Sequence, residues 1–405
     1  MNGCQQGFRS VSSFGLGGQE SASRPPQAIC KPLGTIKKMK KRTKIIIILL
    51  VAFIALFFYG SKNFENDKNH LLHIKTLAAN GNVLDAFNEM EENQSFTNPL
   101  INIAYNKWKN KFYSRFVNKD EIIEPNTDNK VVNDISNIYR EYWINSSFKK
   151  NKQVFSDSIL TSNLYDYLQQ NGLTDLTRNQ LEKSSFEEVK KVIESQNAYS
   201  ASFYLNETYG LKIWDKQAEK KYTIELPLDT LTISVVFIEN YLLKGVADFT
   251  TMGIGKDGGW SSNSNQSLYC NKGEYDLNSE KFKLSYLKHE ANHFVDVLKY
   301  PNLSSTDLEY RSKIIELMYC SKETIYKRIA EFINSASSKE RTHSHPYANY
   351  SLIKGMSKLL FNSEYESDYD KWKNTSVEVI NNAAKQLYNQ SGSKLLKDKN
   401  ASEII

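Results

Sequence analysis

Residues 287–296, which read Leu-Lys-His-Glu-Ala-Asn-His-Phe-Val-Asp, place the strongest constraint on what this chain can fold into. They contain the pattern His-Glu-x-x-His, in which two histidines lie four residues apart. On a helix, residues i and i+4 lie one above the other, so His289 and His293 can direct two imidazole nitrogens at one metal ion. Glu290 lies beside them, where it can act on a water molecule held by that ion.

The residues around this motif predict a helix. Ser279 can cap its N-terminus and Pro301 stops it. At 100° per residue, His289, His293 and Asp296 fall on one side, so they can face a cleft while the other side is buried. Asp296 lies one turn beyond His293, where it is suited to hydrogen-bond the other nitrogen of that imidazole. The opposite, apolar side consists of Leu284, Leu287, Ala291, Phe294 and Leu298.

A second helix is expected to supply the third ligand that a hydrolytic zinc site requires. Ser304-x-x-Asp307 is a variant of the capping box and starts this helix, and the short turn after Pro301 folds it back against the first. Glu309, in its second turn, then lies near the level of the two histidines. Glu316 shares that face and is the reserve candidate. The alternative for either glutamate is a solvated carboxylate on the helix surface.

This combination of His-Glu-x-x-His and a helix-borne Glu resembles the gluzincin branch of the zincin metallopeptidases. The order of strands followed by the motif helix is similar too, because an edge strand lines the cleft in zincins. The interval from His293 to Glu309 is shorter than in well-studied gluzincins. A longer stretch, roughly 200–350, resembles an uncharacterised bacterial family. Its shared residues are Gly258-Gly259-Trp260, Leu268-Tyr269-Cys270, Tyr275-Asp276, Phe282, Ser285-Tyr286-Leu287, His289-Glu290, His293-Phe294, Asp296, Leu308-Glu309-Tyr310-Arg311 and Glu316-Leu317.

The resemblance implies one Zn²⁺ ion, a peptide or protein substrate, and hydrolysis by a metal-activated water with Glu290 as general base. It also implies a downstream His or Tyr that stabilises the oxyanion. His345 is the first candidate, because the residue before Pro346 is expected to be extended. His343 and Tyr310 are weaker candidates. The alternative is that this segment is only a surface loop.

The rest of the chain predicts a mostly helical α+β fold. Helical spacing prevails before residue 200, and β-branched, alternating runs at 221–226 and 231–238 predict a strand pair. A weaker third strand is expected at 249–254, an edge strand at 267–270 and a turn at 256–260. The expected organisation is a disordered leader at 1–36, a basic flank and transmembrane signal anchor at 37–60, a helical region at 61–200, a zincin-like catalytic domain at 201–360, and a C-terminal helix with a frayed tail at 361–405.

The N-terminal segment predicts attachment to a membrane. Six basic residues between 37 and 44 precede an unbroken apolar run at 45–59, and residues 45–60 are expected to cross the bilayer. The positive-inside rule places the N-terminus in the cytoplasm and the catalytic domain in the periplasm or outside the cell. A cleaved signal peptide is the alternative, but Phe58-Tyr59-Gly60-Ser61 offers no small-x-small site. Met39 is an alternative start, which would make 1–38 an over-extended leader.

Charge and cysteine content narrow the function further. Residues 1–60 hold nine basic residues and one acid, and the whole chain carries +6, so 61–405 carry −2. The basic balance therefore belongs to the membrane flank and gives no support for nucleic-acid binding. Cys270 and Cys320 flank the His motif, and they are expected either to form a disulfide or to be two buried thiols.

Three functions remain open on the sequence. The first is a membrane-anchored, externally facing zinc hydrolase, most simply a peptidase. The second is a zincin-fold protein that binds metal without peptidase activity. The third is a non-enzymatic, helix-rich envelope protein in which the His motif is accidental.

Overall fold

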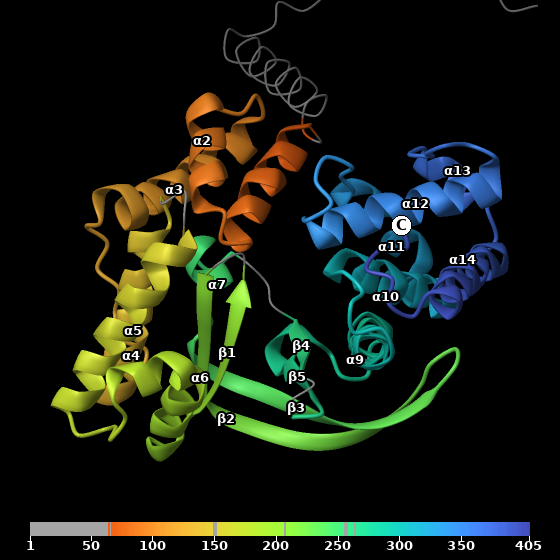
Figure 1. The fold of residues 1–405 in the computed structure, drawn as a ribbon. Helices are drawn as coiled ribbons and strands as arrows, with labels where there is room; N and C mark the ends of the chain where they lie inside the picture. Colours follow the sequence, from red (N-terminus) through yellow and green to blue (C-terminus); the bar gives the residue numbers. More distant parts are fainter. Residues whose placement is uncertain (1–63, 65, 149–151, 206–207, 255–257, 263–264) are drawn as a thin grey trace, which may run out of the picture. The chain divides into compact units, whose positions relative to one another are not determined.

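A computed structural model of the chain describes residues 64, 66–148, 152–205, 208–254, 258–262 and 265–405 (Figure 1). The expected leader, basic flank and anchor at 1–60 lie outside these residues. The described residues all belong to one compact unit, 58–405. Among them, no helix combines the length and the apolar character needed to cross a bilayer. They confirm a mostly helical α+β fold with a small, curled, five-stranded sheet.

The first part of the described chain is helical, as its spacing predicts. A helix at 66–79 precedes α2, and Asn98 caps α3 by accepting hydrogen bonds from the amides of Leu100 and Ile101. Pro99 at the first helical position suits this start, because that position needs no amide donor. The elements are α2 (Val83–Glu92), α3 (Pro99–Phe112), the π-helical η1 (Tyr113–Asn118), α4 (Lys130–Ser146), α5 (Lys152–Gln170) and α6 (Arg178–Ser195).

The sheet has the order β1-β2-β3-β5-β4. The predicted strand pair is confirmed as the antiparallel hairpin of β2 and β3, and both strands are longer than the sequence suggested. β5 pairs with β3 in parallel and with β4 in antiparallel fashion. The strands are β1 (Tyr199–Leu205), β2 (Thr208–Glu225), β3 (Thr230–Leu243), β4 (Gly259–Ser262) and β5 (Ser267–Asn271).

Two strand predictions were wrong. The stretch at 249–254 lies in the short helix α7 (Val246–Thr250) and the turn after it, where threonine hydroxyls donate to carbonyls of the preceding turn. The segment at 267–270 is a strand but not an edge, because β4 pairs outside it where a turn was expected. A Cβ on Gly259 (φ +151°) would lie 2.1 Å from the Tyr269 carbonyl oxygen and 2.6 Å from the Tyr286 ring. The glycines there reflect close packing of a strand.

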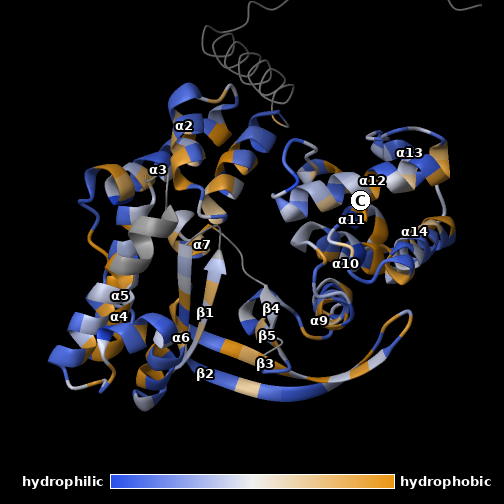
Figure 2. Cartoon of the chain, in the orientation of Figure 1, coloured by the Kyte–Doolittle hydropathy of each residue, from blue (hydrophilic) through white to orange (hydrophobic). Residues whose placement is uncertain are grey.

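The described residues form two main hydrophobic cores. The first joins the helices before β1 to α7 and to one end of the hairpin, represented by Leu211 and Ile213. The second joins the other end of the hairpin, represented by Ile224 and Leu226, to β5 and the later helices. In Figure 2 the helices of both cores carry hydrophobic and hydrophilic residues, as expected where one face of each is buried. The side chains of β2 and β3 therefore pack into the first core at one end of the hairpin and into the second core at the other.

The second core contains the motif helix. α8, η3 and α9 follow one another without a break, and α10 contacts η3, α9, α12 and α14. The elements after the sheet are η2 (Lys272–Glu274), α8 (Glu280–Phe282), the π-helical η3 (Lys283–Lys288), α9 (His289–Lys299), α10 (Ser305–Tyr319), α11 (Ile325–Ser335), α12 (Ser344–Phe361), α13 (Tyr369–Lys373) and α14 (Val377–Lys397).

The C-terminal tail, which was expected to fray, is packed. Ile404 is buried against Leu303 and Leu395. The amides of Ile404 and Ile405 donate to Oδ1 of Asp307 at 2.9 and 3.0 Å. The tail is thus held by a buried carboxylate near the start of α10, a long-range contact that polar composition alone does not reveal.

Candidate metal centre

The predicted motif helix is confirmed over Glu280–Lys299, and the Ser279 hydroxyl caps it by accepting from the Phe282 amide at 3.2 Å. Its apolar side is buried as expected, except that Leu298 is 63% exposed. The opposite side was expected to face a cleft, yet His289 and Asp296 are also buried, because α10 packs there. The π-helical turn η3 ends immediately before His289, and such turns occur frequently at functional sites.

The predicted second helix is confirmed as α10. The Ser304 hydroxyl accepts a hydrogen bond from the Asp307 amide at 3.3 Å, and the helix returns against α9. Every residue from Glu309 to Leu317 is buried, including four charged side chains. Glu309 is only 9% exposed and Glu316 less, so neither is a solvated helix carboxylate.

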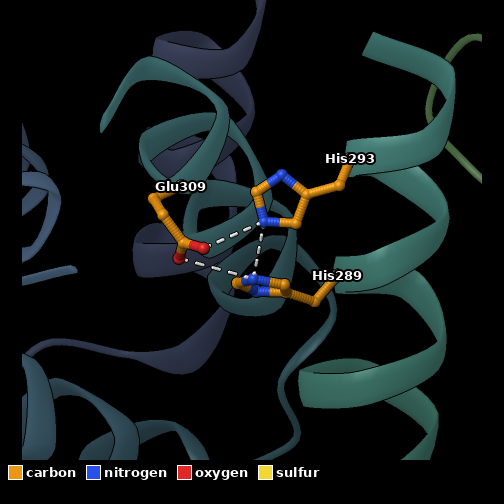
Figure 3. A group of neighbouring side chains, drawn as sticks. All are labelled: His289, His293 and Glu309. Carbon is orange, nitrogen blue, oxygen red and sulfur yellow. Dashed lines mark hydrogen bonds and ion pairs between the residues drawn. The ribbon is translucent and has the colours of Figure 1, made fainter. Parts of the chain in front are cut away.

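The two histidines and Glu309 converge on one point (Figure 3). The Nε2 atoms of His289 and His293 are 3.0 Å apart. Glu309 Oε1 lies 3.1 Å from Nε2 of His293, and Oε2 lies 3.5 Å from Nε2 of His289. Four ligands around zinc at tetrahedral angles are separated by about 3.3 Å, so these spacings fit a metal ion. The buried His-His-Glu group could therefore hold one.

Glu316 lies on the other side of the His289 ring. Its Oε1 is 2.9 Å from Nδ1 of His289, and its Oε2 is 3.2 Å from Nε of Arg328. In the neutral imidazole, a hydrogen bond from Nδ1 leaves the lone pair of Nε2 directed at Glu309 and His293. Burial would raise the pKa of Glu316, but the His289 hydrogen bond and Arg328 lower it to about 2. The reserve ligand candidate thus orients the imidazole.

The charge on His289 follows from the same two carboxylates. Burial alone would lower the pKa of this imidazole, but Glu309 and Glu316 raise it to about 10. In the metal-free protein, His289 is therefore protonated on both ring nitrogens at neutral pH. A metal ion that binds at Nε2 must displace the proton on that nitrogen.

Two further nitrogens approach the Glu309 carboxylate. Nδ1 of His345 lies 2.9 Å from Oε2, and Nζ of Lys313 lies 3.5 Å from the same atom. Burial would raise the pKa of Glu309, but His345, the two motif histidines and Lys313 hold it well below its ordinary value. Oε2 accepts no well-aligned hydrogen bond within the described part of the chain, as suits an atom placed for a cation. Lys313 was not among the predicted site residues, although its spacing of i+4 from Glu309 is a signal.

Asp296 was predicted to hydrogen-bond the imidazole of His293, and this prediction was wrong. Its carboxylate instead accepts two hydrogen bonds from Arg311, at 2.7 Å from Nε and 3.2 Å from Nη2. The antiparallel packing of α10 places Arg311 opposite Asp296, and a guanidinium satisfies both oxygens of a buried carboxylate. No local pattern links residues fifteen positions apart on two helices.

The three downstream candidates for stabilising the oxyanion have different surroundings in the structure. His345 contacts Glu309, as its candidacy required. It was expected to be extended, but it lies in the first turn of α12. Pro346 is tolerated in the same turn because an amide donor is not needed there. His343 instead pairs with Glu340 at 3.2 Å. Tyr310 is buried in the second core, because the residue next to Glu309 on a helix points about 100° away.

Glu290 is partly buried beside the two motif histidines. Burial raises the pKa of its carboxyl, and the opposing effect of His289 and His293 does not cancel the rise. Burial, and then the charge of Glu290, raise the pKa of the Cys270 thiol to about 12, so β5 lies near this carboxylate. Cys270 and Cys320 are both free and buried, which decides the disulfide question in favour of two thiols.

Comparison of the chain with models of known protein families, with curated proteins and with solved structures finds no match. What the site offers is a buried His-His-Glu group for a metal ion, with a carboxylate of raised pKa adjacent to it.

Proposed function

We propose that this chain is a zinc-dependent hydrolase and that it cleaves peptide bonds. The observation that carries the proposal is the convergence of His289, His293 and Glu309, contributed by α9 and α10, within 4.8 Å of one another. Two imidazoles and one carboxylate are a ligand set that hydrolytic zinc uses, and three protein ligands leave one position open. The gluzincin resemblance of the motif points to the same chemistry.

Bound zinc would supply a Lewis acid that polarises a carbonyl and makes water nucleophilic at neutral pH. Glu290 accepts the proton of the attacking water and passes it to the leaving amine. Its raised pKa suits this task, because a stronger base accepts a proton more readily near pH 7. Glu316 holds the His289 ring in the orientation that directs Nε2 at the metal.

His345 remains the proposed donor to the oxyanion. Its side chain is 65% exposed while Nδ1 lies at the Glu309 carboxylate, so it is accessible to a substrate that enters the site. The anchor at 45–60 would hold this site outside the cytoplasm.

Metal binding without turnover is the second candidate. The observation that favours it is the burial of the ligand group, since His289 and Glu309 are both largely covered and Lys313 and His345 close in on the carboxylate. Such a site would hold zinc for stability and give little access to a peptide.

Zinc content and peptide cleavage separate these functions. We expect the purified protein to bind one zinc ion and Glu290→Gln to keep that zinc while losing about 10²–10⁴-fold in cleavage of a peptide library. Glu378→Gln, an exposed carboxylate in the first turn of α14, is the matched control and should cleave normally. A folded protein that takes up no zinc would overturn both candidates. Zinc binding without cleavage in the wild type would leave only the second.

A further inference from the structure

A buried polar network lies beside the candidate metal centre and has no part in the proposed proton transfers. Three helices of the second core contribute to it, and all of its side chains are almost completely buried. Its members are Asn292 and Asp296 from α9, Arg311 and Ser312 from α10, and Tyr388 and Ser391 from α14.

Arg311 is the centre of this network. Its Nε and Nη2 donate to the two oxygens of Asp296, and Nη1 donates to the Ser391 hydroxyl at 2.7 Å. Its guanidinium carbon lies 4.4 Å from the centre of the Tyr388 ring. One side chain therefore touches all three helices.

The network ends at a candidate ligand. Asn292 Nδ2 donates to Asp296 Oδ2 at 2.8 Å and to Ser312 Oγ at 3.1 Å. The Ser312 hydroxyl donates in turn to the backbone carbonyl of His289 at 3.1 Å. Tyr388 completes the amide of Asn292 by donating to Oδ1 at 3.1 Å. The polar contacts thus run from Arg311 to the backbone of the first motif histidine.

Such a network permits only one arrangement of α9 against α10. A two-pronged arginine–carboxylate pair fixes both distance and rotation, and a single-point contact does not. Leaving one member of a buried charge pair unmatched is strongly unfavourable, which excludes neighbouring registers. A slip of one turn would carry Glu309 about 5.4 Å along the helix axis, out of reach of both histidines.

We propose that Arg311 and Asp296 are positioning residues that set the register between α9 and α10, and so bring Glu309 to the two motif histidines. Glu309 lies only sixteen positions after His293, which leaves a short turn to place the third ligand. The network supplies the constraint that the turn by itself lacks. This inference rests on the proposed metal centre, but it concerns the helix pair whether or not a metal is bound.

The test uses Arg311→Met and Arg311→Lys, the second of which keeps the charge and loses the two-pronged geometry. Arg115→Met is the matched control, because Arg115 also pairs with a carboxylate (Glu121) and lies 4.3 Å from an aromatic ring centre (Phe249), but in the first core. Two quantities are measured in folded protein. They are the zinc dissociation constant by chelator competition, and the ring N–H signal of His289 in metal-free protein by nitrogen-15 NMR, which reports its hydrogen bond to Glu316.

We expect both Arg311 variants to bind zinc about 10–100-fold more weakly, to change the visible spectrum of the cobalt-substituted protein, and to lose or shift the His289 N–H signal. Arg115→Met should leave all three unchanged. If Arg311→Met does not fold, the double variant Asp296→Leu/Arg311→Met removes both charges and replaces the ion pair by an apolar contact. It should fold and still bind zinc weakly.

Folded Arg311 variants with wild-type zinc affinity and an unchanged His289 signal would overturn the inference. An equal loss in Arg115→Met would overturn it too, because the effect would then be general destabilisation. A wild type that binds no zinc would refute the proposed function but not the inference about Arg311. The His289 signal of metal-free protein would still decide whether Arg311 sets the register.

Discussion

Each of the two cores contains an arginine that pairs with a carboxylate and lies over an aromatic ring, but the charges around the two pairs differ. In the first, Arg115 lies over Phe249 and pairs with Glu121, and the helices around it bury mostly apolar and aromatic side chains. In the second, Arg311 lies over Tyr388 and pairs with Asp296. There, however, the same helix α10 also buries Glu309, Lys313 and Glu316.

The difference in buried charge distinguishes a core that mainly stabilises the fold from one that contains a candidate functional site. Buried charges contribute little net stability even when paired, because desolvation offsets their attraction. Apolar burial accounts for most of the first core, and the Arg115–Glu121 ion pair lies at its margin. The second core buries a row of charges on one helix next to two histidines, and clusters of strongly shifted pKa values of this kind are typical of functional sites.

The largest expected effect is confined to the second core. His293→Ala removes one of the three proposed ligands, so zinc affinity should fall by more than about 100-fold, the upper range for loss of an outer partner. With wild-type protein, zinc at 100 times its dissociation constant should add about 2.7 kcal/mol of stability. Hydrogen exchange should show protection by zinc in α9 and α10 and none in α4. Equal protection of both cores would break the comparison.

Trp143→Ala is the converse experiment in the first core. Trp143 is buried in α4, and its indole donates to the Tyr209 carbonyl at 2.8 Å. The cavity and the lost contacts should cost about 3–5 kcal/mol of unfolding free energy in a urea titration. Zinc affinity measured on the folded fraction should stay at the wild-type value, and a change there would mean that the two cores are coupled.

Two helix caps offer the smallest and sharpest comparison. Asn98 caps α3 in the first core and Ser304 caps α10 in the second. Each substitution by Ala should cost about 1 kcal/mol in denaturant unfolding. Only Ser304→Ala should also weaken zinc binding, because α10 carries Glu309. Indistinguishable zinc affinities in the two variants would show that the α10 terminus does not control its ligand.

Local sequence rules predicted much of this site. The helix start at Ser279, the second start at Ser304 and the common side of His289 and His293 depend on residues no more than four apart, and the structure contains all of them. Glu309 was reached by the same rules plus a short turn. The approach of His345 to this group was anticipated from its chemistry, although it lies in a helix and not in an extended loop.

The partners of buried charges could not be predicted in this way. Asp296 was assigned to His293, and Glu316 was held as a spare ligand, because nothing nearby indicated Arg311 or the far side of the His289 ring. The strand β4 was interpreted as a turn from Gly258 and Gly259, whose actual constraint is the packing of Tyr275 and Tyr286. Each error concerns a contact between segments distant in the chain.

The sequence by itself determined the chemistry that this protein can offer: a helix with two histidines and a glutamate in one turn, followed by a capped helix with two further glutamates. The tertiary structure decided which glutamate joins the two histidines, which one contacts the far side of the His289 ring, and which arginine pairs with Asp296. The physical reason is that helical periodicity sets directions within one element. The pairing of buried charges depends on how two elements pack, and that is a property of the whole core.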